Sequence, residues 1–558
     1  MLPFAFASAS LLLFELGYSF EAGDQQQYLL LPYREIFPNF LPGDWFTWQT
    51  SHYHVSFAWL VRGLHVLTGP AAFARGMFVV HCLNLGLFGL AIWQLAGSLA
   101  LGTLEASFCV LVFGAVRQVG LAGALVNHAG LVPADLALAP FLLACAAFCR
   151  RRTLAMGAWL GASGLLHANY AVLGPLVLFP LELWHAQRRR RLGPVLGAGA
   201  LFALIASPTL VLLFGTFLTR DAAPDALAVT LFVRSPHHYD LSAMRADEFY
   251  FGALLLLLST PHWRAQRAGG AHGSVYLQLM AAMLVVLAIG AIGSGWHVLS
   301  LARLFTWRMS IPLFALWLLG AAATLKRYAL TRSRAGLVWL FAGCALLLTF
   351  AQRDPLEPSA WNQAPRFAAG MLAAYGCATA WLLFGPPRLA LWSALGSVVA
   401  VGLALQVARS APTTAFGLHF LDARIAIEPQ QRRLFSLVQQ RTPNAARFLI
   451  PPGQNQFRLQ ARRGVFVDWK CAPMKGDEAL EWQRRMLLVM GTQDFPARGY
   501  ELPRIADALY YARPLPELAK LARAEGLTHL LVRRSNITQP DHGLHKLFSL
   551  GEYVVFEL

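Results

Sequence analysis

Long apolar runs separated by short polar clusters occupy the sequence from Leu2 to about Ala408. A helix needs about 20 mostly apolar residues to cross the hydrocarbon core of a bilayer. Such runs recur near residues 2–18, 73–97, 101–116, 131–149, 154–168, 171–185, 192–214, 248–261, 273–293, 311–325, 335–350, 367–385 and 389–408. They predict an all-α polytopic membrane bundle of about 11–13 transmembrane helices over residues 1–408.

The composition changes after residue 408, where Arg, Glu, Asp and Gln become frequent. Helical and strand-like patterns alternate there, which predicts a soluble α/β domain over residues 409–558. Helices are expected over 430–440, 477–490 and 515–524, and strands over 447–450, 465–469, 528–532 and 553–556. This part contains no nucleophile elbow, P-loop or dinucleotide fingerprint.

The formal net charge of +17 is explained by membrane topology. Clusters of Lys and Arg with almost no acids follow several apolar runs, at 150–152, 188–191, 264–267 and 326–334, and should be cytoplasmic. For the first two clusters to share a side, the chain must cross twice between them, as a hairpin turning at 167–170. No nucleic-acid-binding motif accompanies the charge, so no nucleic-acid partner is expected.

The loops on the other face mix acids, arginines and histidines, which a reaction site needs. The first of them, about residues 19–72, is long for a connection between membrane helices. Thirteen spans from a cytoplasmic start would also place the C-terminal domain outside the cytoplasm. The Ala-, Leu- and Arg-rich composition favours a bacterial inner membrane.

Asp24 is the acid of most interest because it follows the first apolar run directly. Near the interface its carboxylate is suited to act as a general base or to hold a cation. Asp before Gln25–Gln27 is also a good N-cap for a short helix. Further along, residues 50–61 have aromatic and apolar residues at helical spacing, which predicts an amphipathic helix in the interface. His52 and His54 diverge on such a helix, which disfavours a metal site there.

These features resemble the GT-C superfamily of membrane glycosyltransferases, which use polyprenyl-phosphate-linked sugars. The resemblance rests on the long first outer loop with an acid after the first helix, interfacial helices, the number of spans and the C-terminal domain. Four segments also resemble an uncharacterised bacterial membrane-protein family associated with that superfamily. They are 234–239 (RSPHHY), 304–308 (LFTWR), the turn at His167, and 462–470 (RRGVFVDWK).

The resemblance implies roles for particular residues. Asp24 would activate the acceptor, with Glu21 or Asp44 assisting. The donor phosphate would be bound by Arg303, Arg308, Arg234, His237, His238 and Arg366, and the pocket lined by His167, Asn169 and His128. Alternatively, each arginine anchors the chain to lipid headgroups, and His167 and Asn169 satisfy backbone groups freed at a turn. The superfamily often has paired acids in the first loop, whereas Gln25 follows Asp24 here, which leaves the use of Mg²⁺ or Mn²⁺ open.

The expected function is the transfer of a sugar from a polyprenyl-phosphate donor to a glycan, lipid or protein acceptor on the extracytoplasmic face. Two other functions fit the same features: transport of a lipid carrier or polysaccharide, and a non-catalytic role in envelope assembly. A lipid- or glycan-binding surface is a further expectation for the basic residues of the C-terminal domain, with a merely solvated surface as the alternative. They are Arg462, Arg463, Lys470, Arg484 and Arg485.

Overall fold

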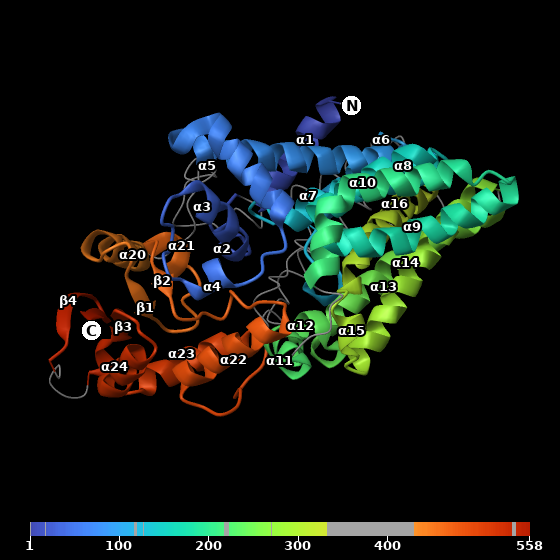
Figure 1. Cartoon of the computed structure of the whole chain (residues 1–558). Helices are drawn as coiled ribbons and strands as arrows, with labels where there is room; N and C mark the ends of the chain where they lie inside the picture. Colours follow the sequence, from blue (N-terminus) through green and yellow to red (C-terminus); the bar gives the residue numbers. More distant parts are fainter. Residues whose placement is uncertain are drawn as a thin grey trace, which may run out of the picture.

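The computed structural model describes residues 2–16, 18–115, 120–126, 128–216, 223–268, 271–331, 429–537 and 543–558. Its described part has a helical bundle at one end and a small sheet at the other (Figure 1). The first loop lies between them, with its short helices beside the C-terminal elements. The spans predicted at 335–350, 367–385 and 389–408 lie outside the described residues, as does Arg366.

Every span predicted before residue 331 coincides with a helix. The bundle contains α1 (Leu2–Leu16), α5 (Val55–Ser98), α6 (Thr103–Ala115), α7 (Pro133–Cys149), α8 (Thr153–Leu166), α9 (Ala168–Arg189), α10 (Gly193–Thr216), α13 (Ala246–Ala268), α14 (Ala271–Gly295) and α16 (Ser310–Thr331). Within the described ranges, four segments are long and apolar enough to cross a membrane: Val55–Ser98, Gly193–Gly215, Val275–Gly295 and Leu299–Arg327. The chain is a multi-pass membrane protein.

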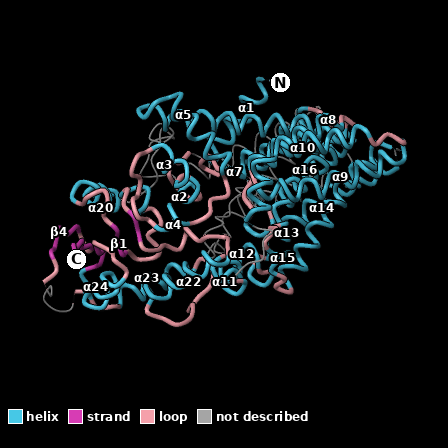
Figure 2. The backbone as a smooth tube through the Cα atoms, in the orientation of Figure 1, coloured by secondary structure: helices cyan, strands magenta, loops and turns pink. Residues whose placement is uncertain are grey.

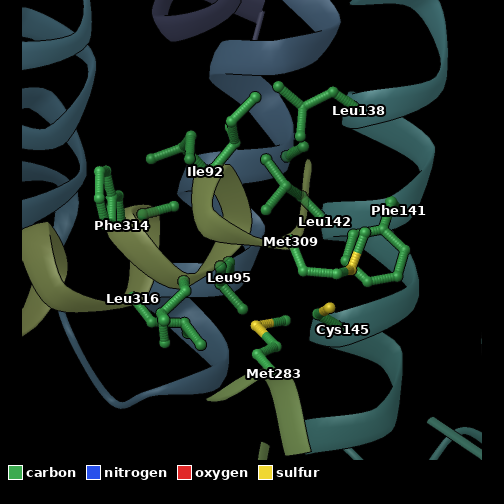
Figure 3. Close-up of a cluster of buried hydrophobic side chains, with 14 of the residues drawn as sticks. Ile92, Leu95, Leu138, Phe141, Leu142, Cys145, Met283, Met309, Phe314 and Leu316 are labelled. Atoms are coloured by element: carbon green, nitrogen blue, oxygen red, sulfur yellow. The ribbon is translucent and has the colours of Figure 1, made fainter. Parts of the chain in front are cut away.

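The bundle has an apolar interior and an apolar exterior. Side chains of α5, α7, α14 and α16 meet in its core, where Leu95, Phe141 and Phe314 are buried (Figure 3). On α10, the apolar residues Leu196 and Leu204 are 71% and 72% exposed. They lie eight residues apart and therefore on one face of the helix. Such a face is stable against lipid tails and unfavourable in water.

Helix α5 joins the two elements predicted for this part of the chain. Its start holds exposed Trp59 and Leu67, as expected of an interfacial helix, and its second half belongs to the bundle core. The two halves meet at Gly69, whose φ of 69° and ψ of 168° are not helical. Gly tolerates this conformation, and Pro70 after it has no N–H to donate to the preceding turn.

The predicted hairpin at residue 167 is present. Helices α8 and α9 meet at His167, whose Nδ1 accepts a hydrogen bond from the backbone N–H of Asn169 (3.1 Å) and caps α9. On the opposite side, α8 packs backbone to backbone against α10. A Cβ added at Gly157 would lie 2.4 Å from the carbonyl oxygen of Ala198, so this position has no room for a side chain.

The C-terminal segment contains a five-stranded mixed sheet in the order β2-β1-β3-β5-β4, and in the described part the strands are confined to this segment (Figure 2). Its elements are α20 (Pro429–Arg441), β1 (Arg447–Leu449), α21 (Phe457–Ala461), β2 (Gly464–Val465), α22 (Gly476–Met490), α23 (Glu501–Ala512), α24 (Leu515–Ala524), β3 (His529–Arg533), β4 (His545–Leu550) and β5 (Tyr553–Glu557). β1 pairs in parallel with β2 and β3, and β5 is antiparallel to β3 and β4.

The predicted α/β character of this segment is confirmed, with differences in detail. Helices α21 and α23 and strand β4 were not predicted. The strand expected over 465–469 ends after Val465, and Asp468 beyond it is buried in an ion network. One carboxylate oxygen of Asp468 pairs with Arg458, and the other accepts a hydrogen bond from the N–H of Cys471 (2.7 Å).

A buried ion network fastens the first loop to the C-terminal segment. Asp44 precedes α4 (Trp45–Gln49), and its Oδ1 accepts from the N–H of Thr47 (2.9 Å). Its Oδ2 accepts from Nε of Arg458 and from the N–H of Val465, each at 2.9 Å. The Asp44 and Arg458 side chains are at most 2% exposed, and an apolar core containing Phe46 and Trp469 surrounds the same contact. The two parts therefore share one interior.

Arg458→Met should destabilise the protein by about 3–5 kcal/mol, since it leaves two buried carboxylates without their common cation. The measurement is thermal unfolding in detergent, with Arg433→Met as the control because Arg433 is exposed on α20. An Arg458→Met protein that unfolds together with the control would contradict the network.

Candidate active site

The Asp24 carboxylate faces two cationic side chains. Its Oδ1 accepts a hydrogen bond from Nζ of Lys470, and its Oδ2 lies 3.5 Å from Nε2 of His128. Asp24 precedes α2 (Gln25–Tyr28), but its side chain makes no capping hydrogen bond. Asp24 thus occupies the predicted N-cap position, but its side chain does not cap the helix, and the carboxylate is 36% exposed.

His128 is oriented by Asp135 at the start of α7. The buried Asp135 accepts from the His128 backbone N–H (2.7 Å) through one oxygen and lies 2.8 Å from His128 Nδ1 through the other. With Nδ1 held in this way, Nε2 points to Asp24. Burial opposes the charged ring, but Asp135 and Asp24 outweigh it and raise the pKa of His128 to about 10. At neutral pH the ring is an imidazolium.

Asp24 is correspondingly ionised. Burial raises the energy of its charged form, but Lys470 and His128 outweigh this and hold the pKa of the carboxyl well below its usual range. A divalent cation does not fit between these two positive groups. Across the described ranges, no three His, Cys, Asp or Glu side chains come together as metal ligands would.

Arg308 belongs to the same cluster of charges. It lies in η4 (Thr306–Met309), with its guanidinium over the Phe305 ring at 5.2 Å. Its Nε is buried and has no hydrogen-bond partner among the described residues. The charges of Arg308 and Asp24 both act on Tyr28, His54 and His238, so the two groups lie around one set of side chains. A buried guanidinium nitrogen without a partner is suited to an anionic ligand.

Two histidines near Arg308 are neutral. Burial, then the Arg308 charge, lowers the pKa of His54 to about 3, and burial lowers the pKa of His238 to about 4. The His54 ring lies 5.0 Å from that of His167, and its Nδ1 is buried without a hydrogen bond in the described part. These rings can accept or donate hydrogen bonds without adding charge.

The segment before Arg308 is pinned by the predicted hairpin. Asn169 Nδ2 donates to the backbone oxygen of Leu304 (2.7 Å), between Arg303 and Arg308. Arg303 follows α15 (Leu299–Ala302), and its charge acts on Tyr239. His167 and Asn169 therefore bind backbone groups at the turn and at Leu304, and their role in lining a pocket stays a prediction.

Arg234 fixes the backbone that carries Lys470. It ends the π-helical turn Thr230–Arg234, which follows α11 (Pro224–Val229). Its Nε donates to the Trp469 oxygen (3.0 Å), its NH2 to the Lys470 oxygen (2.6 Å), and the guanidinium lies over the Trp469 ring. Arg234 was expected to bind phosphate, but these contacts make it a clamp on the C-terminal segment.

The paired histidines in α12 (Pro236–Tyr239) both lie near Gly123 but have different partners. His238 Nδ1 lies 2.6 Å from the Ala122 oxygen, whereas the His237 ring stacks on Tyr500 at 4.2 Å. Burial, then the neighbouring His238, lowers the pKa of His237. Both histidines adjoin the cluster, and His237 marks its boundary with the C-terminal segment.

Two predicted catalytic acids have other roles. Both carboxylate oxygens of Asp44 are bonded within the buried network that contains Arg458. Glu21 accepts hydrogen bonds from the Tyr33 hydroxyl (2.7 Å) and from Gln460 (3.0 Å), and thus joins the first loop to α21. In the sequence, Asp44 and Glu21 lie in the same polar loop as Asp24 and cannot be told apart from it. In the structure, their hydrogen-bond and ion-pair partners differ.

Lys470 was expected on a basic surface, and that expectation is wrong. Each member of the basic group has an acidic or backbone partner within the chain. Lys470 pairs with Asp24, Arg462 with Glu21, Arg484 with Glu481 and Glu525, and Arg485 with Glu481, while Arg463 donates to Thr442 and Gln439. No local feature of the sequence marked Lys470 as a partner of Asp24, because the two residues are 446 positions apart.

His128 should make the stability of the protein depend on pH. Its folded pKa of about 10 lies above the unfolded value of about 6.5, so its contribution is full below pH 6.5 and is lost as pH rises through 10. Stability should fall with pH by up to about 1.4 kcal/mol per unit in this window. His128→Gln should lack this slope, and His545→Gln, at an exposed position, should keep it. The measurement is thermal unfolding between pH 6 and 9, and equal slopes in all three proteins would refute the assignment.

Comparisons with known proteins bear on the fold. The model of a domain of unknown function, DUF6798, matches residues 430–489, which include Arg458 and Lys470. No curated protein matches the sequence. The archaeal oligosaccharyltransferase AglB from Archaeoglobus fulgidus, in complex with an inhibitory peptide and a dolichol-phosphate, has a TM-score of 0.47 at 10% identity. That match covers 95% of this chain and 69% of AglB, and is too remote to support an argument.

Two crystal structures of ArnT from Cupriavidus metallidurans are more similar. The structure bound to undecaprenyl phosphate has a TM-score of 0.56 at 15% identity. The match covers 100% of this chain and 97% of ArnT. The apo structure has a TM-score of 0.50 with the same identity and coverage. Similarity along the whole length at this identity is evidence of a common architecture. The chain therefore has the fold of the GT-C superfamily, as the sequence resemblance implied.

Proposed function

We propose that this chain is a glycosyltransferase that moves a sugar from a polyprenyl-phosphate-linked donor to an acceptor at the extracytoplasmic face of a bacterial inner membrane. One observation carries the proposal: an ionised carboxylate, Asp24, and a buried guanidinium nitrogen of Arg308 without a partner in the described part surround the same side chains. The GT-C fold supports it, and an ArnT of that fold binds undecaprenyl phosphate.

Asp24 would receive the proton of the acceptor hydroxyl. In the transfer, a bond forms between the acceptor oxygen and the anomeric carbon, and the bond from that carbon to the phosphate oxygen breaks. The hydroxyl proton passes to Asp24, and the phosphate leaves on its lipid. A carboxylate with a low pKa is a weak base, which suits a reaction in which the bond to phosphate breaks well before the proton moves.

Arg308 would stabilise the departing phosphate. Its guanidinium offers several N–H donors to phosphate oxygens, and its burial strengthens the interaction with charge that develops during the reaction. The neutral His54 beside it is a further hydrogen-bond donor. Arg303 and Arg366 remain proposed phosphate ligands on the same grounds as in the sequence.

The contact between Lys470 and Asp24 supports a common side of the membrane for the first loop and the C-terminal segment, whatever the number of spans. The predicted cytoplasmic clusters at 150–152 and 188–191 also meet each other, because the charges of Arg151 and Arg189 interact. The basic clusters and the Asp24 cluster are then at different ends of the bundle, as the charge rule requires.

Asp24→Asn should lower sugar transfer from a polyprenyl-phosphate donor in membranes by about 10²–10⁴-fold, because the general base is lost while size and shape are retained. Asp494→Asn, at an exposed position, is the matched control and should be unaffected. Full activity of an Asp24→Asn protein that is correctly inserted would end the assignment. Movement of the lipid carrier across vesicles without a new glycosidic bond would instead identify a transporter.

Arg308→Ala should weaken binding of undecaprenyl phosphate by about 10–100-fold, as expected for losing a charged hydrogen bond to phosphate. Arg504→Ala, exposed on α23, serves as the control. Binding can be measured in detergent without any turnover. Unchanged affinity in Arg308→Ala would exclude Arg308 as the phosphate ligand.

A further inference from the structure

The cation beside Asp24 comes from the other end of the chain. Lys470 lies in the C-terminal segment after β2, 446 residues from its partner. Its ammonium group occupies one carboxylate oxygen of Asp24, and protonated His128 faces the other. Each oxygen of this carboxylate therefore already lies beside a cationic side chain of the protein.

Several hydrogen bonds fix the backbone around Lys470. Arg234 holds the backbone oxygens of Trp469 and Lys470, and the N–H of Lys470 donates to Asn455 Oδ1 (3.2 Å). The N–H of Trp469 donates to the Pro452 oxygen (2.9 Å). The neighbouring Asp468 is fixed in the Arg458 network. The backbone at Lys470 is thus restrained on both sides, which directs a long, otherwise mobile side chain to Asp24.

The two carboxylates and the two cations that contact them are equal in number before a donor binds. Asp24 and Asp135 are negative, and Lys470 and His128 are positive. Arg308 and Arg234 then add positive charge near the place where the single negative charge of a sugar phosphodiester would bind. When the sugar leaves, the lipid phosphate gains one negative charge, and the acceptor proton neutralises Asp24. Lys470 loses its counter-charge at the same step and can balance the new charge on the phosphate.

We propose that Lys470 supplies the resident cation of this site, in the place where a divalent metal would stand beside a catalytic carboxylate, so that transfer requires no metal ion. This inference rests on the proposed function. Lys470 is a positioning residue that acts through Asp24. It keeps the carboxylate ionised and oriented. When Asp24 accepts the proton, the positive charge of Lys470 is no longer paired with it.

Transfer by purified wild type should change less than about twofold after chelation of divalent metals, because the cation is covalently part of the chain. Lys470→Ala should lower kcat by about 100-fold or more with little change in the donor KM. Ethylamine should restore part of that kcat, and Lys470→Arg should retain part of it, neither of which is expected of a merely structural lysine. Lys520→Ala, exposed on α24, is the control. Loss of wild-type transfer on chelation with recovery in Mg²⁺ or Mn²⁺, or full activity of Lys470→Ala, would overturn the proposal.

A second measurement does not depend on turnover. Reductive methylation with formaldehyde and cyanoborohydride, quantified by mass spectrometry, reports how accessible each lysine amine is. Lys470 should be protected in wild type and should react faster in Asp24→Asn, while Lys520 reacts equally in both. Equal reactivity of Lys470 in the two proteins would refute the ion pair. Protection of Lys470 in a wild type that transfers no sugar would reject the proposed function and preserve the assignment of Lys470 to Asp24.

Discussion

The burial of Arg458 between Asp44 and Asp468 is the constraint on which the rest of the site depends. Three charges withdrawn from water are stable only when each has its partners in place, so the network admits essentially one arrangement of the first loop against the C-terminal segment. Lys470 follows Asp468 by two residues. The requirement to satisfy a buried guanidinium therefore sets the position of an ammonium group at the site, and the surrounding apolar core makes that position rigid.

Side chains of the same type differ in protonation state or exposure at this site because their surroundings differ. His128 lies between two carboxylates and is charged, whereas His54 and His238 are buried near Arg308 and are neutral. Asp24 and Asp44 likewise belong to one loop, but one faces a solvent-accessible cluster and the other a closed interior. Arg308 and Arg234 both add positive charge around Tyr28 and His238, where an anionic substrate would be held.

The parts of this structure that are local in sequence were predictable. Apolar runs of membrane length predicted the bundle helices. Such a helix can be buried in lipid without a particular partner elsewhere in the chain. The turn at His167 followed from the charge rule. Asp24 was predicted from its position after the first helix. Arg308 was predicted because it is an arginine in a loop on the face away from the basic clusters. The distinction between Asp24 and Asp44, and the role of Lys470, were beyond reach because the deciding contacts join residues more than 400 positions apart. Helix α23 was missed since its amphipathic pattern follows a segment without a clear start signal.

The pairing of Asp24 with Lys470 also has a consequence for biosynthesis. At ribosomal rates of about 5–20 residues per second, the carboxylate is made roughly 20–90 s before the amine that pairs with it, given the 446 residues between them. During that interval His128 can pair with Asp24, but Lys470 has not yet been made. The pair can therefore form only after synthesis has reached the C-terminal segment, and a chain that stops before residue 470 lacks the ammonium group of this site.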